Sequence, residues 1–251
     1  MLKKRIIPIE LLSKNRLVKT TQFELPRDVG DPIKSSQVYS DQDADELILL
    51  HIDRLSDSIE VLVSTVEKIL KECFVPFTVG GGVRTLSDAE RLFNAGADKI
   101  VINSSCYDKP SLISQIANVA GSQAVVIGID VRKINGKFKL FSNNSKKEEE
   151  VELSEHIKKM ISLGAGEVFI QSVDKDGSMN GYDLELIEIA RKFCDVPLII
   201  AGGAGNFNDL YEAFCRNVDA VACGSLFNFG DNNPLRAKAF LKNYNVPLKI
   251  I

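Results

Sequence analysis

Short apolar runs alternate along the chain with longer segments in which apolar residues recur at helical spacing. Apolar runs of this length predict buried strands, and the helical spacing predicts amphipathic helices. The eight predicted strands are residues 5–9, 46–52, 77–79, 99–103, 124–130, 167–172, 198–201 and 220–223. The predicted helices between them include residues 58–73, 87–95, 109–120, 154–163, 184–193 and 207–216. Strand followed by helix throughout favours βαβ units and a parallel sheet.

The two halves of the chain repeat each other at one fixed offset of 121 residues. Residues 79–82 (VGGG) correspond to 200–203 (IAGG), and residues 103–104 (NS) correspond to 224–225 (GS). Three acids repeat at the same offset: Glu46 with Glu167, Asp53 with Asp174, and Asp98 with Asp219. The repeat indicates two copies of one half, so a ligand site built by it should occur twice. A substrate with a phosphate at each end is the natural match.

The length of the chain fits one closed barrel. It has 251 residues, which is the usual size of a single (β/α)8 barrel. Eight strand units in two equal halves favour closure over an open sheet, and no linker divides the sequence. We therefore predict a single domain over residues 1–251, an α/β (β/α)8 TIM barrel built from two repeated half-barrels. Two long connections, 17–36 and 132–152, are predicted as equivalent loops, the first either a lid or a mobile surface loop.

Charge and composition exclude several classes of function. A net charge of −3 and a pI of about 5.6 give no sign of a nucleic-acid or membrane partner. No apolar run approaches the roughly 20 residues of a membrane span, and the basic N-terminus lacks the apolar stretch of a signal peptide. Five scattered cysteines and two distant histidines indicate reduced thiols and no metal site. We expect a cytoplasmic protein that needs no metal or other cofactor.

Glycine-rich turns after two strands are candidate phosphate sites. Gly82 ends one such turn just before a predicted helix, and Asn103 with Ser104 ends the next strand. Glycines let backbone N–H groups approach an oxyanion, and a helix N-terminus favours negative charge. A glycine turn alone is more often only a tight turn. Here, however, the set of Gly82, Asn103 and Ser104, which we call the first cup, is duplicated in the second half. The second cup consists of Gly203, Gly224 and Ser225.

Asp130 is the candidate acid–base group. It ends the apolar strand 124–130, and the carboxyl ends of barrel strands converge on the active site. The alternative is an aspartate that only caps the following segment. Asp174 and Asp176 follow strand 167–172 in the same way. We expect one of them to bind substrate hydroxyls and the other to stabilise a turn.

Four charged residues stand where strands begin, at the opposite end of the predicted barrel. They are Arg5, Glu46, Lys99 and Glu167. Each of these charges alone is explained as an ordinary solvated residue at the rim of the barrel. As a ring of mixed sign contributed by four strands, they are instead candidates for a salt-bridged gate that closes the bottom of the barrel.

Together these motifs resemble the cyclase subunit of imidazole glycerol phosphate synthase over essentially the whole chain. The matching stretches include residues 3–8 (KKRIIP), 27–32 (RDVGDP), 45–47 (DEL), 77–82 (FTVGGG), 96–99 (GADK), 121–126 (GSQAVV), 176–177 (DG), 181–183 (GYD) and 202–205 (GGAG). The resemblance implies a barrel that takes ammonia from a separate glutaminase subunit along its axis, with the four-charge ring as the gate. It places Asp98 at the glutaminase-facing end, and Lys19, Asp176 and Gly177 at the substrate.

The departures from the family pattern lie at the other end of the barrel. The family has a catalytic aspartate where this chain has Leu11, whereas Asp130 matches the second catalytic carboxylate. Five further family residues are replaced here, by Thr20, Gln22, His51, Gln171 and Ala201. Loss of a general acid or base usually costs about 10²–10⁴-fold in rate. The kept gate and the rewritten pocket favour an enzyme that still receives ammonia but delivers it to another acceptor.

Three hypotheses about function follow. The leading one is an ammonia-dependent synthase subunit that amidinates a nucleotide sugar or glycan precursor, like paralogues of this cyclase in surface-polysaccharide clusters. The second is a true cyclase subunit of histidine biosynthesis in which Glu10 or His51 replaces the missing aspartate. Glu10 is a weak substitute, because adjacent residues on a strand point to opposite faces. The third is a non-catalytic scaffold for a glutaminase. The phosphoribosyl isomerase of the same pathway shares the repeat but has no use for an ammonia gate.

Overall fold

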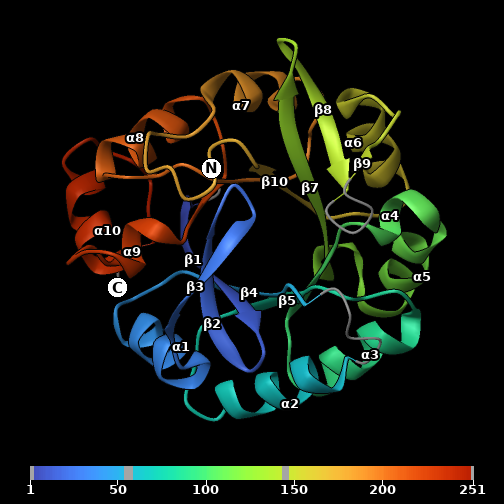
Figure 1. The fold of residues 1–251 in the computed structure, drawn as a ribbon, viewed down its shortest axis with the longest axis horizontal. Coiled ribbons are helices and arrows are strands. Elements are labelled where there is room, and N and C mark those ends of the chain that lie inside the picture. Colours follow the sequence, from blue (N-terminus) through green and yellow to red (C-terminus); the bar gives the residue numbers. More distant parts are fainter. Residues whose placement is uncertain (1–2, 54–58, 143–146, 250–251) are drawn as a thin grey trace.

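Eight parallel strands close into a barrel that is surrounded by helices (Figure 1). The structure, a computed structural model, describes residues 3–53, 59–142 and 147–249. The barrel strands are β1 (Arg5–Ser13), β4 (Leu47–His51), β5 (Phe77–Gly80), β6 (Lys99–Ile102), β7 (Val125–Ile134), β10 (Glu167–Ser172), β11 (Leu198–Ala201) and β12 (Ala220–Cys223). Strand β1 pairs in parallel with β4 and β12, and pairing of β7 with β10 closes the ring. The predicted (β/α)8 fold and all eight predicted strands are confirmed.

The helices repeat the two-fold pattern of the sequence. They are α1 (Pro32–Asp41), α2 (Glu60–Ile69), α3 (Leu86–Asn94), α4 (Ser105–Asp108), α5 (Ser111–Ala120), α6 (Leu153–Ser162), α7 (Leu184–Arg191), α8 (Phe207–Cys215), α9 (Ser225–Asn228) and α10 (Pro234–Lys242). Helices α3 and α8 both begin with a capping box, Thr85 with Asp88 and Asn206 with Asp209. Such reciprocal caps satisfy otherwise unpaired N–H groups. Because the two pairs stand at the same offset of 121 residues, the local start signal is duplicated along with the fold.

The two long connections are hairpins, and their prediction as loops was wrong. Strand β1 turns at Lys14 and Asn15 into β2 (Arg16–Thr21), which pairs with β3 (Glu24–Gly30). Strand β7 likewise turns at Asn135 and Gly136 into β8 (Lys137–Ser142), which pairs with β9 (Lys147–Glu148). Both turns have positive φ at their two central residues, as type I′ turns require, and the Asn-Gly pair was a readable signal for one. Residues 143–146 lie outside the described part of the chain.

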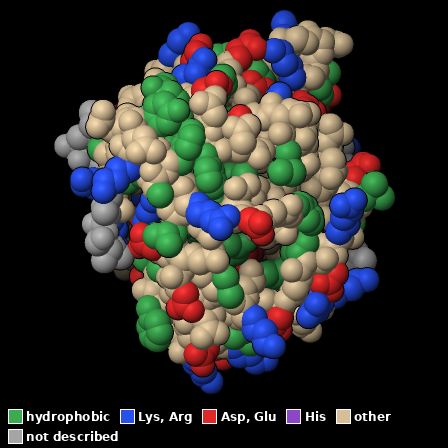
Figure 2. All heavy atoms as spheres, turned by 90° about the vertical axis from the view of Figure 1, so that its left-hand side faces the viewer, with side chains coloured by type: hydrophobic (Ala, Val, Ile, Leu, Met, Phe, Trp, Pro, Cys, Tyr) green, Lys and Arg blue, Asp and Glu red, His purple; other side chains and the backbone are tan. Residues whose placement is uncertain are grey.

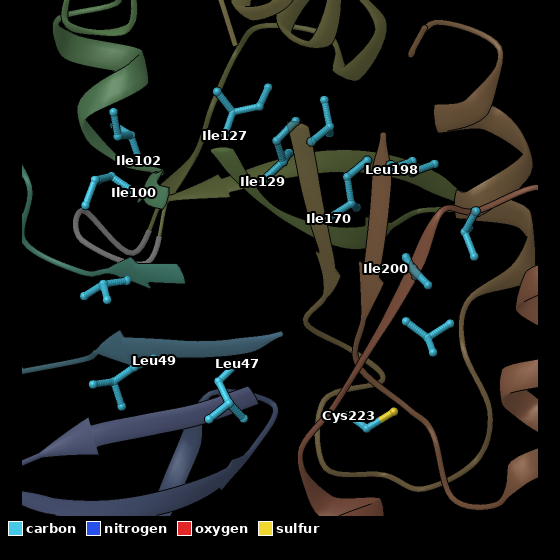
Figure 3. Packing of buried hydrophobic residues seen from close by; sticks show 14 of the residues in the cluster. Leu47, Leu49, Ile100, Ile102, Ile127, Ile129, Ile170, Leu198, Ile200 and Cys223 are labelled. Atoms are coloured by element: carbon cyan, nitrogen blue, oxygen red, sulfur yellow. The ribbon is translucent and has the colours of Figure 1, made fainter. Parts of the chain in front are cut away.

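Buried apolar side chains form two separate layers. Ile127 and Ile129 point outward from β7 into the large layer between strands and helices (Figure 3). Val126, the residue before Ile127 on the same strand, belongs to the smaller layer inside the barrel. Since successive residues of a strand face opposite sides, one strand fills both layers. Because the inner layer is apolar, the polar groups that face the barrel axis lie at the two ends of the strands.

On the side formed by α8 and α10, the outer surface of the described residues has no large patch of charges of one sign (Figure 2). Figure 2 shows lysine, arginine and acidic side chains interspersed with scattered hydrophobic ones on this face. Within the described ranges, no helix has the length and apolarity needed to cross a membrane.

Candidate active site

The four predicted gate residues meet at the bottom of the barrel. Arg5 Nη1 lies 2.6 Å from Glu46 Oε2 and 3.2 Å from Glu167 Oε1. Lys99 Nζ lies 2.9 Å from Glu46 Oε2 and 3.0 Å from Glu167 Oε1. Each cation therefore contacts both anions, and the ring carries no net charge. The structure brings together all four residues; their role as an ammonia gate stays a prediction.

Glu46 is the best-anchored member of this ring. It is 1% exposed, and its Oε1 accepts a hydrogen bond of 2.5 Å from Thr78 Oγ1. Burial would raise the pKa of Glu46, but the charges of Arg5 and Lys99 outweigh it and hold that pKa below its usual range. Sequence reasoning missed Thr78, although it is the inward-facing residue of β5 at this level. The ring is thus assembled within this chain alone.

A layer of packed apolar side chains separates the ring from the other end of the barrel. The inner layer is made of Ile7, Ile9, Ile48, Val101, Val126, Phe169, Ile199, Ala201, Ala220 and Ala222. Its side chains come from strands on all sides of the barrel, and they present no charge to the axis. A small neutral molecule meets no ionic barrier there, whereas an ion would lose its hydration.

At the carboxyl ends of the strands, a cavity of about 310 Å³ opens beside the axis. We call it the mouth cavity. It is lined by inward residues of the barrel strands, by the first cup, and by Phe23 and Pro26 of the first hairpin. Its volume lies at the lower end of the range for small-molecule sites, roughly 300–1,000 Å³. The predicted site therefore coincides with a real cavity at the expected end of the barrel.

Asp130 is the titratable centre of this cavity. Its side chain is buried, and one carboxylate oxygen accepts a hydrogen bond of 2.9 Å from Asn103 Nδ2. Burial raises the pKa of Asp130 to about 7, against the lowering effect of the Asn103 bond and with a further rise from the charge of Asp176. A carboxyl group with such a pKa can both give and take a proton near neutral pH.

Leu11 stands opposite Asp130. Strand β1 is four strands away from β7 in either direction around the barrel, and Leu11 lines the mouth cavity from that side. Glu10, its neighbour, is buried on the other face of β1, where its Oε2 accepts from Ser36 Oγ of α1 at 2.7 Å. Glu10 therefore points away from the mouth cavity, as the alternation along the strand predicts, which fits its description as a weak substitute for the missing aspartate.

His51 lies beside the position of the missing aspartate. It pairs in the sheet with Leu12 and lines the mouth cavity, and its Nε2 is 3.3 Å from Asp53 Oδ2. Asp53 also accepts from Ser13 Oγ at 2.6 Å and from the backbone N–H of Lys14 at 2.7 Å. His51 is thus tied to a carboxylate that anchors the turn after β1, rather than to Asp130.

The first cup is formed as predicted. Gly82, Asn103 and Ser104 all line the mouth cavity. Their neighbour Gly81 must be glycine, because its φ is +97° and a Cβ there would overlap the backbone of His51. Asn103 of the first cup donates a hydrogen bond to Asp130, so the cup adjoins that carboxyl group.

The second cup is also assembled, but around a much smaller space. Gly203, Gly224 and Ser225 line a cavity of about 20 Å³ together with Lys19, Asp176 and Gly177. Lys19 Nζ lies 3.1 Å from Asp176 Oδ1. Asp176 also accepts from Thr20 Oγ1 at 2.8 Å and from Gln171 Nε2 at 3.3 Å. The donor role of Thr20 and Gln171 was not anticipated, because the contacts depend on how the first hairpin folds over the mouth.

The remaining predicted acids have structural partners. Asp174 accepts from the backbone N–H of Lys133 at 2.7 Å, which matches the role of Asp53 in the other half. Asp98 is exposed at the ring end and accepts from the N–H of Phe77 at 2.8 Å. Asp174 thus takes the turn role that was expected for one of its pair. The proposed contact of Asp98 with a partner stays a prediction.

Comparison with known proteins identifies the family. A family model described as "Histidine biosynthesis protein" matches residues 5–233. The chain belongs to this family. It is 38% identical to "Imidazole glycerol phosphate synthase subunit HisF" of Thermotoga sp. (strain RQ2) over 250 residues, covering 100% of this chain and 99% of the relative. It is 39% identical to the protein of the same name from Exiguobacterium sibiricum over 249 residues, covering 99% and 100%.

These findings confirm the resemblance to the cyclase subunit and its enzyme class. They give no support to a separate sugar-amidinating branch. Names of the relatives favour the histidine-pathway hypothesis, the second of the sequence analysis, over the leading one.

Proposed function

We propose that this chain is the synthase subunit of a glutamine-dependent complex, which receives ammonia at the charged ring and adds it to a phosphorylated acceptor in the mouth cavity. One observation carries the proposal: a neutralised ring and a buried carboxyl of pKa about 7 lie at opposite ends of the barrel, with only the uncharged inner layer between them. Asp130 supplies the proton transfers at the acceptor, and the first cup binds its phosphate group.

The partner we propose is a glutaminase subunit docked over the ring end, where Asp98 is exposed. The chain and its cognate glutaminase should co-purify, and the complex should hydrolyse glutamine faster than the glutaminase alone. A glutaminase that neither binds the chain nor is stimulated by it would contradict the proposal.

The first candidate acceptor reaction is the one in the relatives' name, the synthesis of imidazole glycerol phosphate. Identity of 38–39% over full length supports it, as do the retained ring, Asp130 and the two cups. In this chain Asp130 would act without a carboxylate across the cavity, since Leu11 occupies that place.

A second candidate is amidination of a nucleotide sugar or similar glycan precursor. The observation that favours it is Leu11 itself: an apolar wall replaces a proton-transferring group at the cavity, and neither Glu10 nor its Ser36 contact faces that space. A non-catalytic scaffold is the weakest candidate, because a carboxyl group buried beside an open cavity has no structural use there.

Complementation separates the two acceptors. A histidine auxotroph that lacks the cyclase subunit receives either this chain or its Leu11→Asp variant, with excess ammonium so that no glutaminase is required. Growth with the unaltered chain assigns imidazole ring closure. Growth only with Leu11→Asp assigns a different acceptor, because it shows that the barrel folds and that only the missing carboxylate prevents ring closure.

A further inference from the structure

The mouth cavity reaches down to the inner apolar layer at Gly128. This glycine lies on β7 between Val126, which belongs to the inner layer, and Asp130, and all three share the inward face of the strand. Val101 and Phe169 also belong to the inner layer, and both line the mouth cavity together with Gly128. We call Gly128, Val101 and Phe169 the floor of the cavity. Ammonia that crosses the inner layer from the ring enters the cavity at this floor.

Gly128 leaves space in the floor beside Asn103. A Cβ built on Gly128 would lie 3.0 Å from Val101 Cγ1 and 3.2 Å from Asn103 Cβ, and both distances are shorter than ordinary van der Waals contacts. Asn103 follows β6 and is a neighbour of Gly128 because β6 and β7 pair in parallel up to Ile102 and Ile127. The missing side chain of Gly128 thus leaves room next to the side chain of Asn103.

The amide oxygen of Asn103 is left without a partner. Its Nδ2 donates to Asp130 Oδ2 at 2.9 Å, whereas its Oδ1 is buried and has no hydrogen-bond partner in the described part of the chain. An unpartnered buried acceptor is costly, so this atom favours a ligand that brings an N–H or O–H group. It cannot donate to a phosphate group. The amide of Gln171, which also lines the cavity, is already used, because its Nε2 donates to Asp176.

We propose that Asn103 and Asp130 form the site that receives ammonia at the floor of the mouth cavity. Ammonia has three N–H groups and one lone pair. Two of the N–H groups bind Asn103 Oδ1 and the carboxylate of Asp130, which a hydrogen bond already holds side by side. The lone pair then stays free to face the acceptor. This inference rests on the proposed function, because it specifies where the nitrogen source of that function binds.

The test is the binding of ammonium chloride to the intact chain, followed by residue-resolved NMR at several pH values above the range in which Asp130 titrates. We expect saturable shifts of the Gly128 backbone amide and the Asn103 side-chain amide. Tetramethylammonium, a cation without N–H groups, should give none. The apparent Kd for total ammonium should fall as the pH rises, because the neutral form binds. Absent shifts, equal shifts with tetramethylammonium, or a Kd that does not fall with pH would each overturn the proposal.

Two variants separate the oxygen atom from the space. Asn103→Leu removes the acceptor at similar size and should weaken ammonium binding at Gly128 by about 3–10-fold, the equivalent of one neutral hydrogen bond. Gly128→Val fills the floor and should abolish the response of Asn103. The control is Asn94→Leu, at an exposed asparagine that ends α3, and it should keep the parent Kd. A folded Asn103→Leu protein with the parent Kd would overturn the role of Asn103, whether or not Gly128→Val folds.

Neither a glutaminase nor the acceptor takes part in these measurements. A glutaminase that does not dock would therefore contradict the proposed function and leave the ammonium shifts unchanged. Absent ammonium shifts in a chain that still binds and stimulates its glutaminase would overturn the receiving site alone.

Discussion

The two ends of the barrel differ in whether their charged groups are paired with opposite charges. At the ring end, Arg5 and Lys99 each contact both Glu46 and Glu167 within 3.2 Å, so every charge is compensated. At the mouth, Asp130 has an amide donor from Asn103 and no ion pair with any described residue. The first arrangement is fixed by its own pairing, whereas the second leaves a carboxyl group able to change its protonation state.

This difference accounts for which residues agree with the family pattern, those of the ring, and which depart from it, those of the mouth. In the role we propose for it, the ring admits ammonia and is independent of the acceptor, which accounts for the presence of all four of its residues. The mouth must fit one acceptor, and there Leu11, Thr20, His51 and Gln171 depart from the family pattern. Two of these substitutions, Thr20 and Gln171, both donate to Asp176, so the changes at the mouth are structurally connected.

The largest expected effect is at Asp130. Asp130→Asn keeps the shape and an oxygen for Asn103 but removes the exchangeable proton. Product formation should fall by about 10²-fold or more, measured with saturating ammonium. The matched control is Asp174→Asn, which alters a carboxylate bound to the Lys133 backbone and should leave turnover within a few-fold. An active Asp130→Asn enzyme would move the chemistry away from the mouth cavity.

Leu11→Asp should have the opposite sign. It places a second carboxyl across the cavity from Asp130 and should raise imidazole ring closure by about 10²-fold, the usual contribution of a general acid or base. Leu50→Asp lines the same cavity from β4 and is the positional control, with no gain expected. Ring closure that is unchanged by Leu11→Asp, in a folded variant, would show that position 11 does not limit this chemistry.

Lys99→Met should uncouple the two ends. It retains the stem but removes two contacts, and the ring is left with an uncompensated negative charge. Glutamine-driven product formation should fall relative to ammonium-driven formation, while glutamine hydrolysis continues. Lys139→Met, in an ion pair with Glu152 away from the ring, is the control. Equal loss with both nitrogen sources would assign Lys99 to folding rather than to passage.

The smallest effect concerns Glu10, a buried carboxyl that belongs to neither end. Burial raises the pKa of Glu10 to about 7, so the folded state holds this proton more tightly than the unfolded state. Stability is therefore lost as pH rises from about 4.5 through 7. Glu10→Gln should be more stable than the parent by about 1–3 kcal/mol at pH 8 and nearly equal at pH 4. Denaturant unfolding at both pH values measures this, and a pH-independent difference would contradict it.

The barrel, its repeat and the ring were predictable from local signals. Apolar runs mark strands wherever both faces are buried, and a fixed offset aligns Glu46 with Glu167 without any structure. The first hairpin was missed because its charged strand β3 is exposed along most of its length and has no apolar alternation. The Lys19–Asp176 pair was not predictable either, because the contact spans 157 residues and depends on how the hairpin folds over the mouth.

The most direct test of the central claim follows the nitrogen atom from one end of the barrel to the other. The complex with the cognate glutaminase is given glutamine labelled with ¹⁵N in its amide group, together with unlabelled ammonium in the solvent. The label is then measured in the acceptor product by mass spectrometry. Passage from the ring to Asp130 predicts product labelled well above the bulk ammonium pool, and Lys99→Met should lower that enrichment. Product with the same label as the bulk pool would show that ammonia reaches the mouth through solvent, and would contradict the account.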